Sequence, residues 1–315
     1  MTRILSFPLL LVALLSSAPA NEPNSQDRGS EILDSILAQA WAKSWKPARL
    51  EGIRLVTPKP DQKHPTGLPA VWTAKVRGAR DQPGILMWDS ANGGQLVEFT
   101  LDAKLTIEGE NARAVTGVPA LQQFAIEGDD GKSVASGCVP TAAASVLSYW
   151  VTERFPQWKG EGGKTPQALT RRLRSRLQMS IIPDEDGFTE NGMSLAGAWP
   201  RMLAKVIRAD AAEHAVAITC DYKPFSMEKL KEEIEAARPV LVSCIVRVPH
   251  KPELSWGHEL AAVAWAEIDG VEMVGVLDNF FPTKHPETIR WIRNDAFDSM
   301  IMIRPLGEQT EPAAD

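Results

Sequence analysis

The chain has 315 residues, of which 44% are hydrophobic, so it can bury one large core or two smaller ones. This composition excludes a disordered or fibrous protein. The formal net charge is −6, and there is no extended run of Lys and Arg of the kind that binds phosphates, so no nucleic-acid partner is expected.

Residues 1–20 are predicted to be a signal peptide. Arg3 precedes an apolar run over 4–15, and the small residues Ala18 and Ala20 fit a signal-peptidase site. We expect the mature protein to be secreted or periplasmic. No stretch reaches the ~20 apolar residues that a membrane span needs, so no stable span is expected, with a retained N-terminal anchor as the alternative.

Residues 21–112 are predicted to form a small N-terminal domain without catalytic residues. Apolar residues at helical spacing predict an amphipathic helix from Ser30 to about Trp45. An antiparallel sheet of about four strands follows, because short β-rich runs alternate there with turn-forming clusters. The expected strands are 52–57, 70–76, 84–88 and 95–101.

Residues 136–150 predict a helix with a cysteine at its N-terminal end. Gly137 permits a tight entry, Pro140 falls in the first turn, and apolar side chains continue at helical spacing to Trp150. Free backbone N–H groups and the helix dipole favour a thiolate over a thiol at such a position. Cys138 is therefore a candidate nucleophile, with a buried structural thiol as the alternative.

The other two cysteines are Cys220 and Cys244, which lie in the predicted strands 215–220 and 240–248. The helix expected between these strands starts after the N-cap Ser226. In an oxidising compartment such a pair can form a disulfide. We therefore predict a Cys220–Cys244 disulfide, with two buried thiols as the alternative.

His258 is the histidine best placed to act as a catalytic base. It stands just before the predicted strand 260–268, and Asp269-Gly270 joins that strand to 271–277 in a hairpin. Antiparallel pairing returns the residues after the second strand to the neighbourhood of His258. The other four histidines are expected at the surface or in structural roles.

Two residues compete to orient this histidine. With a two-residue turn, Asn279 shares a face of the hairpin with His258, whereas a single β-bulge gives that position to Asp278. A cysteine at a helix N-terminus, an imidazole, and a carboxylate or amide behind the imidazole are the components of a thiol enzyme.

Three blocks of the chain carry a resemblance to a known family. They are 137–150, 227–242, and 257–265 together with 275–278. They resemble the nucleophile helix, the helix before a Pro-Val strand, and the base strand with its orienting aspartate in papain-like cysteine peptidases of the bacteriocin-leader-peptidase type, family thirty-nine, in its secreted stand-alone branch. The first block is also similar to streptopain-type peptidases. The resemblance covers roughly 118–305.

The resemblance implies an α+β fold with a papain-like peptidase domain over 113–306, preceded by the helix-plus-sheet domain and followed by a disordered tail at 307–315. It implies Cys138 as nucleophile, His258 as general base and then acid, and Asp278 as orienting residue, with Asn279 as the alternative. Neither a cofactor nor a metal is implied. In the family a proline usually follows the aspartate, whereas this chain has Asn279.

A glutamine before the cysteine donates to the oxyanion in this family. The segment 118–123 is similar to the family's Val-Pro…Gln segment and points to Gln123, with Gln122 as the fallback. Its separation from Cys138 is longer than usual, because the loop 127–132 lies between them. Lys132 occupies the place nearer to papain-like spacing.

Together these features predict a monomeric bacterial cysteine peptidase that hydrolyses a peptide or protein substrate. The N-terminal domain resembles a pro-segment, so a zymogen cleaved within 105–118 is expected. The alternatives are a papain-like amidase or transamidase acting on cell-wall peptides, and a catalytically inactive binding protein.

Overall fold

The structure is a computed structural model that describes residues 25–58, 68–91, 93–102, 106–127, 133–160, 165–177, 199–248, 251–280 and 287–307. The α-helices are α1 (Ser25–Ala38), α2 (Cys138–Glu153), α3 (Pro166–Arg176), α4 (Trp199–Glu213) and α5 (Met227–Glu235), and the 3₁₀ helices are η1 (Ala40–Trp45), η2 (Pro156–Lys159) and η3 (Asn294–Ala296). The signal peptide predicted at 1–20, Lys132, and the tail after Gly307 lie outside the described residues.

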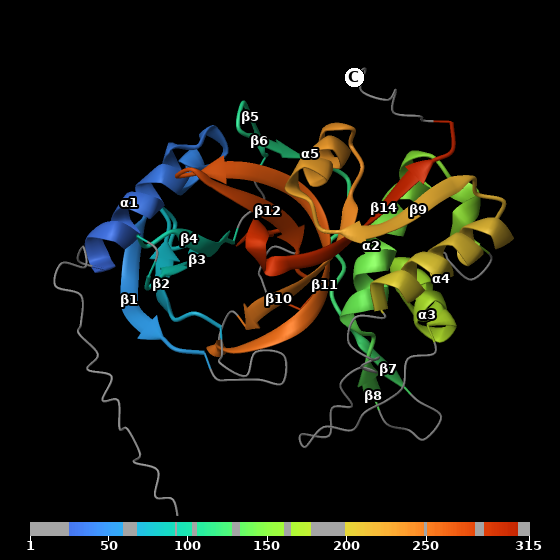
Figure 1. Cartoon of the computed structure of the whole chain (residues 1–315), viewed down its shortest axis with the longest axis horizontal. Coiled ribbons are helices and arrows are strands. Elements are labelled where there is room, and N and C mark those ends of the chain that lie inside the picture. The colour runs from blue at the N-terminus through green and yellow to red at the C-terminus, as the bar shows by residue number, and fades with distance from the viewer. Residues whose placement is uncertain are drawn as a thin grey trace, which may run out of the picture.

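The strands form one large antiparallel sheet and a separate small hairpin (Figure 1). They are β1 (Arg49–Val56), β2 (Val71–Arg77), β3 (Pro83–Asp89), β4 (Leu96–Leu101), β5 (Glu108–Gly109), β6 (Ala112–Ala114), β7 (Ala125–Glu127), β8 (Ser133–Ala135), β9 (Ile218–Pro224), β10 (Val240–Val248), β11 (Lys251–Ile268), β12 (Val271–Leu277), β13 (Ile289–Arg293) and β14 (Phe297–Pro305). The large sheet has the order β1-β2-β3-β4-β13-β12-β11-β10-β14-β9, and β6 pairs with both β11 and β5. Helices and a large antiparallel sheet together confirm the mixed α+β class.

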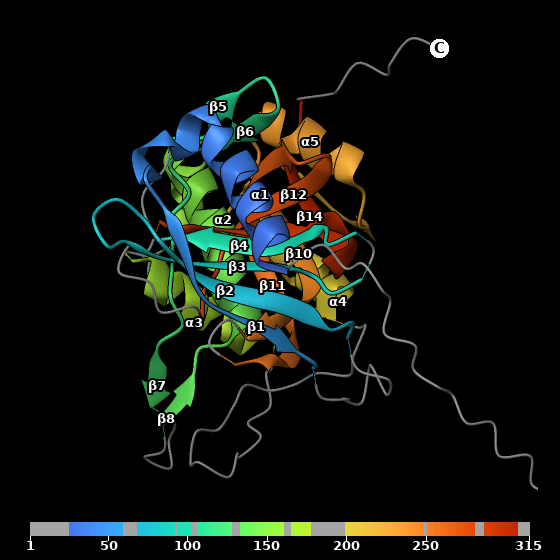
Figure 2. The ribbon, with the colours of Figure 1, turned by 90° about the vertical axis from the view of Figure 1, so that its left-hand side faces the viewer.

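The N-terminal strands continue the sheet that carries the candidate site. The four expected strands are present as β1 to β4, and β4 pairs with β13 near the other end of the chain. α1 covers this part of the sheet (Figure 2). Its apolar side chains are buried, and Trp41 of η1 stacks on Trp291 of β13 with ring centroids 5.3 Å apart. The described residues between 25 and 102 and the C-terminal strands therefore share one hydrophobic core.

The helix α2 is buried along most of its length. Its small residues, Ala142 to Ala144 among them, are buried, and the helix packs against β11 and β10. Gly137 is its N-cap and has φ 92°, a conformation that side-chain-bearing residues rarely adopt. Within the described residues, no helix combines the length and apolar character that crossing a membrane requires.

The hairpin of β11 and β12 forms as predicted. Asp269 and Gly270 both have positive φ, at 55° and 71°, as a two-residue turn of this handedness requires. The pairing register shifts between Ala262 and Ala264, so Val263 is the extra residue of a β-bulge. On the side of the bulge away from the turn, each residue of β11 therefore shares a face with a different set of β12 residues than it would without the bulge.

The predicted Cys220–Cys244 disulfide is absent from the structure. All three cysteines are free thiols, and Cys220 and Cys244 are buried. They lie on β9 and β10, which are separated by β14, the last of the described strands. Cys220 pairs with Ile303 and Cys244 with Phe297 along that strand, so the two thiols are separated in both directions of the sheet. A disulfide requires Cα atoms closer than ~7 Å.

Candidate active site

Cys138 is the first residue of α2 and is half-buried. Three contacts fix the entry to this helix. Thr141 Oγ1 donates to the Gly137 carbonyl at 2.6 Å and lies 3.0 Å from Ser136 Oγ, and Arg174 donates to the Ser136 carbonyl at 3.1 Å. The thiol is therefore held at the end of the helix where N–H groups are free and the dipole is positive.

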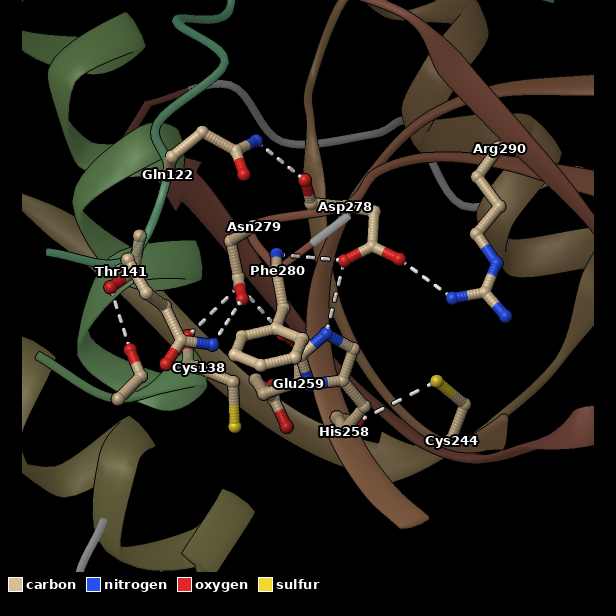
Figure 3. Close-up of polar contacts among 12 residues, drawn as sticks. Gln122, Cys138, Thr141, Cys244, His258, Glu259, Asp278, Asn279, Phe280 and Arg290 are labelled. Atoms are coloured by element: carbon tan, nitrogen blue, oxygen red, sulfur yellow. Dashed lines mark hydrogen bonds and ion pairs between the residues drawn. The ribbon is translucent and has the colours of Figure 1, made fainter. Parts of the chain in front are cut away.

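His258 lies between Cys138 and Asp278 (Figure 3). Its Nε2 is 3.2 Å from Asp278 Oδ1, and the Cys138 side chain is near enough to raise the pKa of the same imidazole. Both His258 and Asp278 are buried, at 7% and 8% exposure. The structure thus brings together Cys138, His258 and Asp278 from α2, β11 and the end of β12.

This environment favours the imidazolium form. Burial alone lowers the pKa of His258, but the hydrogen bonds and charges of Asp278 and Cys138 outweigh it and raise that pKa to about 9. For Asp278, burial acts to raise the pKa, and the hydrogen bond with His258 and the charge of Arg290 lower it overall. At neutral pH the pair is therefore an imidazolium beside a carboxylate.

Asp278 uses both carboxylate oxygens. Oδ1 also accepts from the backbone N–H of Phe280 at 2.9 Å, and Oδ2 accepts from Arg290 Nη1 at 2.6 Å. Arg290, at 1% exposure, in turn binds Glu98 of β4 through two nitrogens, each at 2.9 Å. The carboxylate that faces His258 is thus fixed from two sides.

Asn279, the alternative orienting residue, points away from the imidazole. Its Nδ2 donates to the carbonyls of Cys138 and Glu259, each at 3.1 Å, and its Oδ1 accepts from Gln123 Nε2 at 2.9 Å. The bulge at Val263 is the physical reason, because it moves Asp278 rather than Asn279 onto the face of His258. Asn279 instead ties the start of α2 to β11.

The two candidate oxyanion residues are used differently. Gln123 spends one amide N–H on Asn279, and its Oε1 is buried without a hydrogen-bond partner. Gln122 donates through Nε2 to the backbone carbonyl of Asp278 at 2.8 Å. Gln123 therefore keeps a second N–H for another acceptor beside the start of α2.

Arg290 and Glu98 were not predicted from the sequence as site residues. Each is a charged residue within an apolar strand: Arg290 in β13 and Glu98 in β4. Both are almost fully buried, at 1% and 3% exposure. Opposite charges inside two apolar strands were a signal available in the sequence, because a charge buried in a sheet needs a partner.

Glu259, the neighbour of His258, is a second buried acid near the site. It accepts from Ser243 Oγ at 2.5 Å, while its Oε1 has no hydrogen-bond partner. Burial is the main reason that the pKa of Glu259 is raised to about 7, and the Ser243 hydrogen bond and the His258 charge oppose this shift.

Aromatic side chains lie beside His258. The Trp256 ring is 6.0 Å from the imidazole centroid and 4.9 Å from the ring of Phe280, edge to face. Phe280 is 39% exposed. These two rings provide an apolar surface next to the Cys138–His258 pair.

A thiol, an imidazole and a carboxylate in this arrangement have the chemistry that nucleophilic catalysis requires. Among the described residues, no cluster of three or more His, Cys, Asp or Glu side chains has the arrangement to hold a metal ion. No protein-family model matches the chain, and no curated protein matches it significantly.

Proposed function

We propose that the protein is a cysteine peptidase of papain-like arrangement that hydrolyses peptide bonds through a thioester on Cys138. One observation carries the proposal: a cysteine at the N-terminus of a buried helix lies beside an imidazole whose pKa it raises, and Nε2 of that imidazole is 3.2 Å from a buried carboxylate. This is the arrangement that activates a thiol and orients its base.

In the first half of the reaction the Cys138 thiolate attacks the peptide carbonyl carbon. The tetrahedral intermediate collapses to a thioester as the C–N bond breaks, and the His258 imidazolium gives its proton to the leaving amine. In the second half the neutral imidazole takes a proton from water, which attacks the thioester and releases the acid and the thiolate. Asp278 holds the ring and stabilises its charged form throughout.

The developing oxyanion needs hydrogen-bond donors at the start of α2. The backbone N–H of Cys138 is one, since the first N–H groups of a helix have no partner within it. The second N–H of Gln123 is the other that we propose. Such donors act on charge that exists only in the transition state, so each contributes to turnover rather than to ground-state binding.

A secreted or periplasmic monomer acting on peptides or proteins is part of the proposal, and so is cleavage within 105–118. The segment 112–114 of that region is β6, which pairs with β11 at Ala264 and its neighbours. An unclipped chain that is fully active would remove the cleavage step from the proposal.

Digestion of a peptide library by the purified full chain tests the activity. We expect internal cleavage of peptides by the wild type and none by Cys138→Ala, with Cys220→Ala as the matched control that retains activity, because Cys220 is buried on β9 away from His258. Release of ammonia or amide exchange without internal cleavage would point to an amidase or transamidase. Absence of all turnover and of Cys138 labelling would point to a binding protein.

A further inference from the structure

We infer that Arg290 is a positioning residue for Asp278 and that Glu98 of the N-terminal sheet holds Arg290, so that residues 25–102 are a working part of the enzyme. This inference rests on the proposed function, because it concerns the same imidazole. It concerns a row of four buried groups, Glu98, Arg290, Asp278 and His258, that links β4 to Cys138.

The geometry of this row leaves Arg290 little freedom. Its Nη1 donates to Asp278 at 2.6 Å, its Nε and Nη2 hold both oxygens of Glu98 at 2.9 Å, and its Nη2 also donates to the Arg247 carbonyl at 2.7 Å. A bidentate guanidinium–carboxylate pair fixes both position and plane. The remaining nitrogen is thereby aimed at Asp278.

The charges along the row alternate in sign. The Arg290 guanidinium, at 1% exposure, needs negative charge nearby to offset the cost of burying its own charge. Without Glu98, the Asp278 carboxylate alone would have to balance both Arg290 and the His258 imidazolium. Glu98 supplies the second negative charge, which leaves Asp278 free to support the imidazolium. The strand pairing that brings Glu98 there joins β4 to β13, with Glu98 opposite Ile292.

The row ties the N-terminal part of the chain to the candidate site. Glu98 is the only member of the row that comes from residues 25–102, and β13, which carries Arg290, is hydrogen-bonded to β4. Loss of these residues would expose one edge of β13 and leave Arg290 without its bidentate partner. Cleavage within 105–118 is compatible with activity only while the N-terminal part stays docked.

Other titratable groups also face His258. They are Cys138 from α2, Asp278 at the end of β12, Glu259 of β11 and Cys244, its pairing partner on β10. None of these changes in the variants proposed below. A change in the protonation of His258 in those variants therefore reports on Glu98 and Arg290.

Two substitutions in the full chain should shift the pH profile of kcat/KM in opposite directions. The part that shifts is its alkaline limb, where activity is lost as His258 loses its proton. Glu98→Gln removes a negative charge, so the imidazolium is less favoured and the limb should move to lower pH by about one unit. Arg290→Met removes a positive charge, so the limb should move to higher pH. Both should lose at least about tenfold in kcat through misplacement of Asp278, and Arg290→Lys should recover part of that loss.

Glu233→Gln is the matched control, because Glu233 is also fully buried and ion-paired, with Arg238 and Arg304. The alkaline limb of the kcat/KM profile of Glu233→Gln should stay at the wild-type pH even if the variant is destabilised. Should either row variant fail to fold, the double variant Glu98→Met with Arg290→Met removes the whole pair and should fold with reduced kcat. Wild-type kcat and an unmoved limb in the folded variants would overturn the inference.

Failure of the proposed function is distinguished by NMR titration of His258 in the same chains. If the wild type neither cleaves peptides nor is labelled at Cys138, the proposed function fails. Opposite shifts of the His258 pKa in Glu98→Gln and Arg290→Met would still support the inferred roles of Glu98 and Arg290. Mass spectrometry of labelled, active enzyme should also find a fragment that contains Glu98. Fully active labelled protein that lacks residues 25–102 would contradict the inference.

Discussion

Replacing Asp278 by Asn tests the central electrostatic feature of the site. The pKa of His258 is raised from 6.5 to about 9, which corresponds to about 3 kcal/mol in favour of the imidazolium. Asp278 and Cys138 supply this preference against the cost of burial. An opposite charge at this distance shifts a pKa by roughly 1–3 units, so we expect the pKa of His258 to fall by at least about one unit in the variant.

The amide introduced by Asp278→Asn also cannot accept hydrogen bonds from all three donors that Asp278 now serves. Oδ1 of Asp278 accepts from His258 and from the Phe280 N–H, while Oδ2 accepts from Arg290. An amide NH₂ must replace one of these oxygens, so it faces either the guanidinium or the imidazole. Loss of orientation and of the charge should therefore lower kcat by roughly 10²–10⁴-fold.

The assay is kcat/KM against pH with a peptide from the library digest. His258 is protonated below its pKa, so activity that needs the imidazolium is kept below about pH 9 in the wild type and is lost above it. In Asp278→Asn this loss should begin at lower pH. Asp210→Asn is the control, since Asp210 is a fully buried carboxylate bonded to Trp158 and Arg172, away from His258. A folded Asp278→Asn enzyme with wild-type turnover and an unmoved limb would refute the reasoning.

Three further predictions follow from the surroundings of the pair. Gln123→Ala should lower kcat by roughly 10²–10³-fold with little change in KM, while Gln122→Ala should cost much less; equal losses would contradict the oxyanion assignment. Glu259→Gln should raise the free energy of unfolding by up to about 3 kcal/mol at pH 8 but little at pH 4. The reason is that the raised pKa of Glu259 favours the folded protein below pH 4.5, and this stability is lost as the pH rises through 7. Urea titrations at the two pH values measure the effect, and equal changes at both would contradict it. Phe280→Ala should raise KM for substrates with large apolar side chains while kcat is kept, and an unchanged KM across such substrates would show that the Trp256–Phe280 surface is not a subsite.

Local patterns in the sequence predicted the elements of the site well. The entry at Gly137, the helical spacing after it and the turn at Asp269-Gly270 depend on residues close together in the chain. They placed Cys138 at the start of a helix and His258 just before a strand; the structure contains both elements, and β11 begins earlier, at Lys251, so that it includes His258. The choice between Asp278 and Asn279 stayed open, because it depends on a bulge at Val263 that alternation alone does not reveal.

The pairing of strands that are far apart in the chain could not be predicted from the sequence. The insertion of β14 between β9 and β10 separates Cys220 from Cys244, and the joining of β4 to β13 brings Glu98 to Arg290. Both depend on contacts between segments far apart in the chain, which local periodicity cannot specify. The charged residues within β4 and β13 were visible, but their pairing required the sheet order.

Covalent labelling of Cys138 is the most direct test of the proposed nucleophile. The full chain is incubated at neutral pH with a peptidyl electrophile and analysed by intact and peptide mass spectrometry, with His258→Ala as the comparison. We predict one adduct per chain, on Cys138, formed much faster in the wild type than in His258→Ala, with Cys220 and Cys244 unmodified in the folded protein. Equal labelling rates in the two proteins, or an adduct on a buried cysteine instead, would contradict the account.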